Sequence, residues 1–84
     1  LGIEEMINAV LERMGSVKEI YLLGDYARGV DADQIDILIM GPVLNFEYIS
    51  DLEIKLSKLL NKKVVIITSS SSDIRIDKLL IFSN

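Results

Sequence analysis

Cysteine and histidine are both absent from this sequence of 84 residues, and proline occurs only once. Without these side chains the protein has no disulfides, no thiol nucleophile, no imidazole acid–base catalyst and no zinc site of the usual cysteine and histidine kind. Any chemistry that the chain performs must therefore use carboxylates, hydroxyls, lysine, arginine or tyrosine.

Positive charge is also scarce, because nine Lys and Arg residues face thirteen Asp and Glu residues, for a formal net charge of −4. Such a balance opposes a phosphate backbone, so we expect no direct contact with nucleic acid. No apolar run approaches the roughly 18–20 residues of a membrane span, and the N-terminus lacks the order of a signal peptide. These features predict a cytoplasmic protein that does not enter a membrane.

Apolar side chains, by contrast, make up 50% of the residues. A chain of this length has room for one core, so residues 1–84 are expected to form a single domain. Because folding at this size buries only about 60–65% of the unfolded chain's surface, some apolar surface should stay exposed. We expect that surface to pack against a second copy, as a homo-oligomer, or against an adjacent domain of a longer chain, since the sequence opens on Leu1 instead of methionine.

Hydrophobic periodicity predicts alternating helices and strands. Helices are expected at residues 3–14, before Gly15, and at residues 45–60, between Asn45 as N-cap and Asn61. A shorter helical turn is expected from Asp25, as its N-cap, to Gly29, with an acidic loop at residues 30–34 after it. Strands are predicted at residues 17–23, 35–40 and 64–68, the last two apolar on both faces. Residues 69–73 are predicted to form a flexible loop. The apolar tail, residues 74–84, is predicted to contain a short strand at residues 79–82. The order α-β-α-β-α-β-tail indicates an α/β fold in which helices flank a small mixed sheet.

Two segments carry a family resemblance. The first, from Val17 to Gly29, is an apolar strand followed by Gly-Asp-Tyr-Ala-Arg-Gly, and the second is Ile-Asp-Ile-Leu-Ile at residues 35–39. In this arrangement the chain resembles the nucleotidyltransferase superfamily of DNA polymerase β type, in its minimal form, over residues 1 to 68. The order of the remaining elements is also similar to that of the family.

The resemblance implies that the turn at Gly24 lies where the family holds a nucleotide triphosphate. The family has serine at the position of Asp25, and a carboxylate there repels phosphate oxygens. Capping of the short helix is the structural alternative for Asp25. Arg28 either contacts a nucleotide phosphate or forms an ion pair with Asp25 or Asp36.

Metal binding in the family needs two carboxylates at alternate positions of one strand, so that both project to one side and hold Mg²⁺. In the register that aligns Asp36 with the second carboxylate, Gln34 occupies the first, and an amide does not carry the required charge. Val65 corresponds to the third carboxylate. The resemblance therefore indicates degenerate catalytic positions at Asp25, Gln34, Asp36 and Val65 and no bound metal or cofactor. We expect Asp36 to be held by Arg28 or by backbone N–H groups.

These substitutions favour a catalytically degenerate domain that senses a ligand or binds a partner. It resembles domains on the C-terminal side of winged-helix DNA-binding modules in bacterial transcriptional regulators. Two alternatives stay open. One is an active, Mg²⁺-dependent minimal nucleotidyltransferase of the toxin–antitoxin kind, with Asp33 and Asp36 forming the metal site. The other is a plain oligomerisation domain.

Overall fold

Helices and strands account for most of the chain in the computed structural model, which describes residues 2–70 and 75–84. The helices are α1 (Ile3–Arg13), α2 (Gly24–Ala27), the 3₁₀ turn η1 (Phe46–Tyr48) and α3 (Ile49–Leu60). The strands are β1 (Gly15–Ser16), β2 (Glu19–Leu23), β3 (Gln34–Met40), β4 (Val43–Leu44), β5 (Lys63–Ser69) and β6 (Lys78–Ser83). This order confirms the predicted α/β class.

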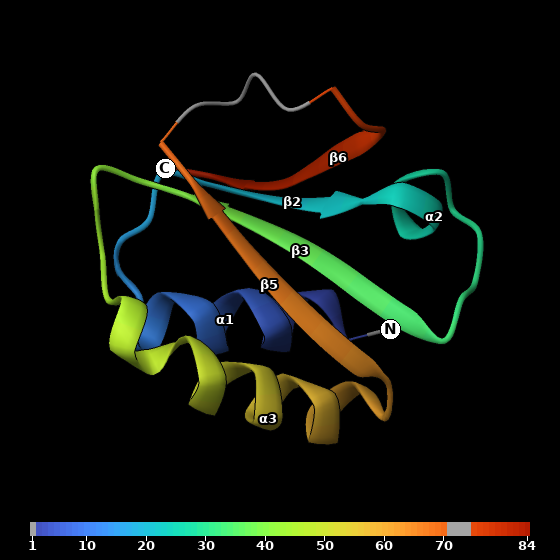
Figure 1. Cartoon of the computed structure of the whole chain (residues 1–84), viewed down its shortest axis with the longest axis horizontal. Coiled ribbons are helices and arrows are strands. Elements are labelled where there is room, and N and C mark those ends of the chain that lie inside the picture. The colour runs from blue at the N-terminus through green and yellow to red at the C-terminus, as the bar shows by residue number, and fades with distance from the viewer. Residues whose placement is uncertain (1, 71–74) are drawn as a thin grey trace.

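A mixed sheet of four strands, in the order β5-β3-β2-β6, forms the frame of the molecule. Strand β2 pairs antiparallel with both β3 and β6, whereas β3 and β5 are parallel and are joined through α3. Helices α1 and α3 lie side by side against one face of the sheet (Figure 1). A two-stranded ribbon of β1 and β4 extends the fold beside them.

The main core lies between these helices and the sheet. It is built from fully buried side chains of both layers, which include Met6, Val10, Ile20, Ile35, Ile37, Ile39, Leu52 and Leu56. A second buried cluster contains Tyr21, Leu23, Leu38 and Met40, which alternate with core residues along β2 and β3 and so point to the opposite face. Strand β3 is therefore buried on both faces, as its apolar sequence predicts.

Strand β5 departs from the prediction of burial on both faces. Val64 and Ile66 are buried against α3, but Ile67 is 40% exposed on the other side. The reason is that β5 is an edge strand of the sheet, so fewer neighbouring side chains cover its outer residues.

The ends of the long helices follow local signals only in part. Gly15 follows α1 with φ +93°, and Asn61 closes α3 with φ +52°. Both residues have a positive φ, as predicted for residues that end a helix. Asn45 is not the N-cap of α3, because η1 intervenes and the Asn45 amide donates to the carbonyl of Arg13 at 3.3 Å. Leu59, an apolar residue near the end of α3, is 49% exposed.

The tail forms the outer strand β6, which confirms the strand predicted at residues 79–82. The loop predicted at residues 69–73 falls largely on residues 71–74, which lie outside the described residues. The assignment of residues 1–84 to one domain remains a prediction. Within the described ranges 2–70 and 75–84, none of the helices is both long enough and apolar enough to cross a membrane.

Candidate functional site

The turn at Gly24 joins β2 to α2 and lies at the end of the sheet where β3, β5 and β6 all begin (Figure 1). Gly24 has φ +60° and starts α2, with Leu23 at the cap position. Asp25 therefore lies inside the first turn and makes no capping hydrogen bond, so its predicted N-cap role is wrong. Gly29 follows α2 with φ +76°, as predicted for the residue that ends it.

Arg28 holds two carboxylates at this turn. Its Nη2 donates to Asp25 Oδ1, and its Nη1 donates to Asp77 Oδ2 at 2.6 Å. The hydrogen bond with Asp77 is the main reason why the pKa of Arg28 is raised. The predicted ion pair with Asp25 is confirmed, whereas the alternative pairing of Arg28 with Asp36 is wrong, because Arg28 reaches the start of β6 instead.

Asp36 is half-buried near the start of β3 and accepts a hydrogen bond from Gln34 Nε2 at 2.7 Å. Both side chains point to the face of the sheet opposite α1 and α3, since they occupy alternate positions with the core residues Ile35 and Ile37. The amide of Gln34 thus holds Asp36 in place of the arginine or backbone partners that the sequence predicts.

The parallel register of β3 and β5 places Asp36 beside Val65 and Gln34 beside Lys63. The three positions that the resemblance singles out, Gln34, Asp36 and Val65, are therefore neighbours in the structure. Sequence reasoning did not foresee that Lys63 lies beside Gln34. The lysine-rich end of α3 was the available signal, but only the strand register decides which lysine reaches this site.

Mg²⁺ is the metal that the resemblance implies for this site. In the part of the chain that the structure describes, no three or more Asp or Glu side chains gather closely enough to hold a metal ion. Gln34 supplies a neutral amide to Asp36, Val65 supplies no ligand, and Asp33 lies in the loop before β3. The described residues therefore do not fit the family's carboxylate site for Mg²⁺.

A network of hydrogen bonds fixes the loop between α2 and β3. Tyr26 Oη lies 2.6 Å from Asp31 Oδ1 and 2.9 Å from the carbonyl oxygen of Ala32, so its single hydroxyl hydrogen has both oxygens as acceptors within reach. From the end of α3, Lys62 donates to the same two acceptors at 2.9 Å and 2.7 Å. No local pattern in the sequence indicates this network, because Lys62 lies 31 residues beyond Asp31.

This network predicts a pH dependence of stability. The hydrogen bonds from Tyr26 and Lys62 lower the pKa of Asp31 below 3.8, and the hydrogen bond to Asp31 raises the pKa of Lys62 above 10.5. Asp31 therefore stabilises the fold above its ordinary pKa, and this contribution disappears as the pH falls through the lowered value. The contribution of Lys62 is present below 10.5 and disappears as the pH rises through its raised value. We expect Asp31→Asn to lower the urea midpoint at pH 7, with a difference from wild type that shrinks as the pH falls below the ordinary Asp pKa of 3.8.

Asp33→Asn is the matched control for this experiment, since it removes the same charge two residues away, where no ion pair is found among the described residues. Equal midpoints for Asp31→Asn and wild type at pH 7 contradict the stabilising role of the network.

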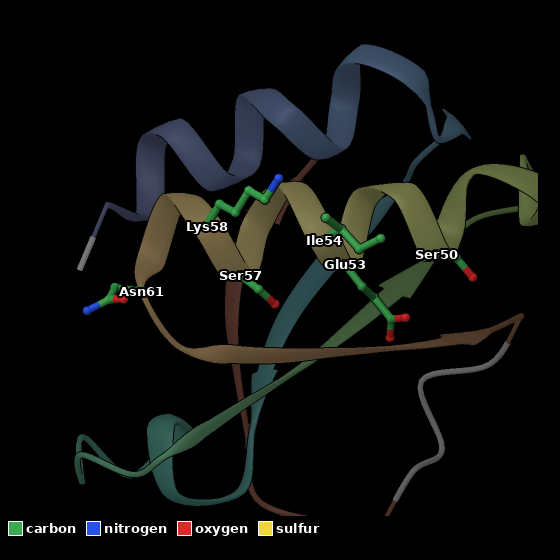
Figure 2. A pocket seen from close by; sticks show the side chains of 6 residues that line it. All are labelled: Ser50, Glu53, Ile54, Ser57, Lys58 and Asn61. Atoms are coloured by element: carbon green, nitrogen blue, oxygen red, sulfur yellow. The ribbon is translucent and has the colours of Figure 1, made fainter.

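A groove of about 540 Å³ runs along the outer side of α3 and is lined by Ser50, Glu53, Ile54, Ser57, Lys58 and Asn61 (Figure 2). Two of these side chains bind the free edge of β5. Ser57 Oγ accepts the N–H of Val64 at 3.0 Å, and Glu53 Oε2 accepts the N–H of Ile66 at 2.8 Å. These bonds satisfy edge donors that a further strand would otherwise use. The groove therefore has a structural explanation and lies apart from the Gly24 turn.

Comparison with known proteins places this geometry in context. A scan against protein-family models finds no match. The chain is 42% identical over 71 residues to "Putative protein adenylyltransferase MJ0604" of Methanocaldococcus jannaschii, which covers 81% of this chain and 67% of the relative.

Two solved structures share the fold. A crystal structure of a toxin–antitoxin with AMP-PNP is 25% identical, with a TM-score of 0.72, over 84% of this chain and 61% of that chain. The complex of tri-AMPylated HEPN toxin with MNT antitoxin from Shewanella oneidensis is 20% identical, with a TM-score of 0.75, over 100% of this chain and 71% of that chain. The chain thus spans less than two thirds of the AMP-PNP-bound structure's chain.

These comparisons correct the functional expectation. The interpretation as a catalytically degenerate module of a transcriptional regulator is wrong, because the relative is described as an adenylyltransferase and the similar structures come from toxin–antitoxin systems. The winged-helix resemblance receives no support. The departures at Asp25, Gln34 and Val65 therefore do not by themselves indicate that the reaction is lost. With 42% identity over two thirds of the relative, this chain belongs to the family of that protein adenylyltransferase and has the nucleotidyltransferase fold.

Proposed function

We propose that this domain transfers an adenylyl group from ATP to a hydroxyl group of a partner protein, as the antitoxin member of a toxin–antitoxin pair. The observation that carries the proposal is the 42% identity to the adenylyltransferase of M. jannaschii. The grouping of Gly24, Arg28, Gln34 and Asp36 at one end of the sheet supports it, because that end offers a turn for the nucleotide and a carboxylate for the reaction.

The reaction forms a bond between the acceptor's hydroxyl oxygen and the α-phosphorus of ATP. The bond between that phosphorus and the oxygen bridging to the β-phosphate breaks, and pyrophosphate leaves. We assign Asp36 as the general base that accepts the hydroxyl proton, since it is the carboxylate that β3 itself carries, at the end of the sheet where the Gly24 turn lies. Gln34 orients Asp36 through its 2.7 Å hydrogen bond.

A protein partner is the remaining element of the proposal. In the S. oneidensis complex the HEPN toxin is AMPylated and is bound to its MNT antitoxin. By analogy, the partner here is a toxin whose hydroxyl groups receive the adenylyl group. Homo-oligomerisation and an adjacent DNA-binding domain remain predictions from the sequence, with half-exposed Leu79 and Leu80 of β6 as the apolar surface available for contact.

Isotopically labelled ATP tests the proposed reaction. The domain is incubated with Mg²⁺ and the protein encoded by the neighbouring gene, with the label on either the α- or the γ-phosphate of ATP. Adenylyl transfer predicts that α-label appears in the partner and γ-label does not, because pyrophosphate carries the γ-phosphate away. Label from the γ-phosphate would instead indicate phosphoryl transfer, and the absence of both labels would contradict the proposal.

A further inference from the structure

Asp77, immediately before β6, makes two contacts with the candidate nucleotide turn. Its backbone carbonyl accepts the N–H of Gly24 at 3.0 Å, and its carboxylate accepts Arg28 Nη1 at 2.6 Å. The antiparallel pairing of Leu23 with Lys78 brings the start of β6 to this turn, although 49 residues separate Arg28 from Asp77. The start of β6 is thereby part of the surroundings of the site.

These contacts occupy the groups that a phosphate needs. Arg28 is the cation at this turn, and its two guanidinium nitrogens already donate to Asp25 and Asp77. The Lys78 ammonium, next in the chain, lies 5.6 Å from the ring centre of Tyr21. An incoming phosphate therefore meets two carboxylates that compete with it for one guanidinium.

Of the two carboxylates, Asp77 is the one that is free to withdraw. Asp25 belongs to α2 together with Arg28, three residues away in sequence, so the two remain close whatever happens at the turn. Asp77 comes from another part of the chain, and its side chain is 60% exposed. Turning this side chain toward solvent costs little and frees one donor face of Arg28.

We propose that Asp77 is a positioning residue that holds the Arg28 guanidinium through its carboxylate and sets the affinity of this turn for nucleotide phosphate. The inference rests on the proposed function, because it takes ATP as the ligand of the Gly24 turn. Binding replaces the Asp77 carboxylate on Arg28 by a phosphate oxygen. The affinity for ATP then depends on the competition between the Asp77 carboxylate and the phosphate for Arg28.

Calorimetric titration with ATP and with inorganic tripolyphosphate tests this role. We expect Asp77→Asn to bind both probes about three- to tenfold more tightly, because the substitution keeps the shape of the side chain and removes its charge. Arg28→Ala should weaken binding by about tenfold or more. Asp77→Asn should bring no gain in the Arg28→Ala background, because the contact acts through the guanidinium.

Asp51→Asn is the charge-matched control, since Asp51 lies in the first turn of α3, at the end of the molecule opposite α2 (Figure 1). The inference is overturned if Asp77→Asn and Asp51→Asn bind the probes with equal affinity. It is also overturned if Asp77→Asn raises the affinity equally with and without Arg28, or if neither probe binds. Failure of the proposed function looks different: phosphate binding responds to Asp77 as expected, but no α-label reaches the partner protein.

Discussion

Replacing Asp36 with asparagine is expected to lower the rate of adenylyl transfer by about 10²- to 10⁴-fold, the range typical of a lost general base. The substitution keeps the size of the side chain and its place beside Val65, but the amide does not accept the hydroxyl proton. The measurement is the initial rate at which α-label enters the partner protein. Because Asp36 is half-buried and its hydrogen bond with Gln34 remains available to an amide oxygen, we expect the variant to fold.

Two further variants make this result specific to Asp36. Asp33→Asn removes one negative charge from the neighbouring loop and should leave the rate within about twofold of wild type, since exposed charges act weakly at a distance. Gln34→Asp should create Mg²⁺ binding, because it places a second carboxylate on the same side of β3, and it should lower the rate, because the amide that orients Asp36 is lost. Full activity in Asp36→Asn would exclude the general-base role.

Replacing Gly41 with alanine is expected to destabilise the domain by about 3 kcal/mol, at the upper end of the usual cost of overpacking. A Cβ atom at this position would overlap the carbonyl oxygen of Ser16 and lie 3.0 Å from Leu44 Cδ2. Backbone of the β1–β4 ribbon does not yield as a flexible side chain does, because Ser16 is paired with Val43. Urea denaturation measures the free energy of unfolding. If this free energy falls with urea concentration as steeply in the variant as in wild type, the substitution has not changed the unfolded state.

Gly29→Ala is the matched glycine control. Gly29 has φ +76°, but nothing lies within 4 Å of the Cβ that alanine would add. Its replacement therefore introduces only backbone strain, at a cost of about 1–2 kcal/mol. If Gly41→Ala loses no more stability than Gly29→Ala, the close approach of Ser16 to Gly41 does not govern stability.

Local signals were sufficient for much of the fold. The periodicity of residues 3–14 predicted α1, and the apolar run at residues 35–40 predicted a strand buried on both faces, as Ile37 and Leu38 are. The same reasoning failed for β5, because an apolar run does not reveal whether its strand lies in the centre or at the edge of a sheet. Ile67 is consequently exposed.

For the site, alternation along one strand was enough to place Gln34 and Asp36 on the same side. The family order of elements pointed to Val65, which the register of β3 and β5 then brought beside Asp36. The functional conclusion drawn from these residues was nevertheless wrong, since departures at Asp25, Gln34 and Val65 do not by themselves show that the reaction is absent. Membership of the adenylyltransferase family rests on the whole pattern of 71 aligned residues, to which any single position contributes little.

The amino-acid sequence by itself determined the element types, the alternating faces of the strands and the exclusion of cysteine and histidine chemistry, because these depend on residue identity and on neighbours a few positions apart. Only the tertiary structure decided which charges that are far apart in the chain meet. Arg28 pairs with Asp77 and Lys62 with Asp31 across separations of 49 and 31 residues. These contacts follow from strand pairing and helix placement, which bring the starts of β3, β5 and β6 to one end of the sheet. The spacing of the residues along the chain does not predict these contacts.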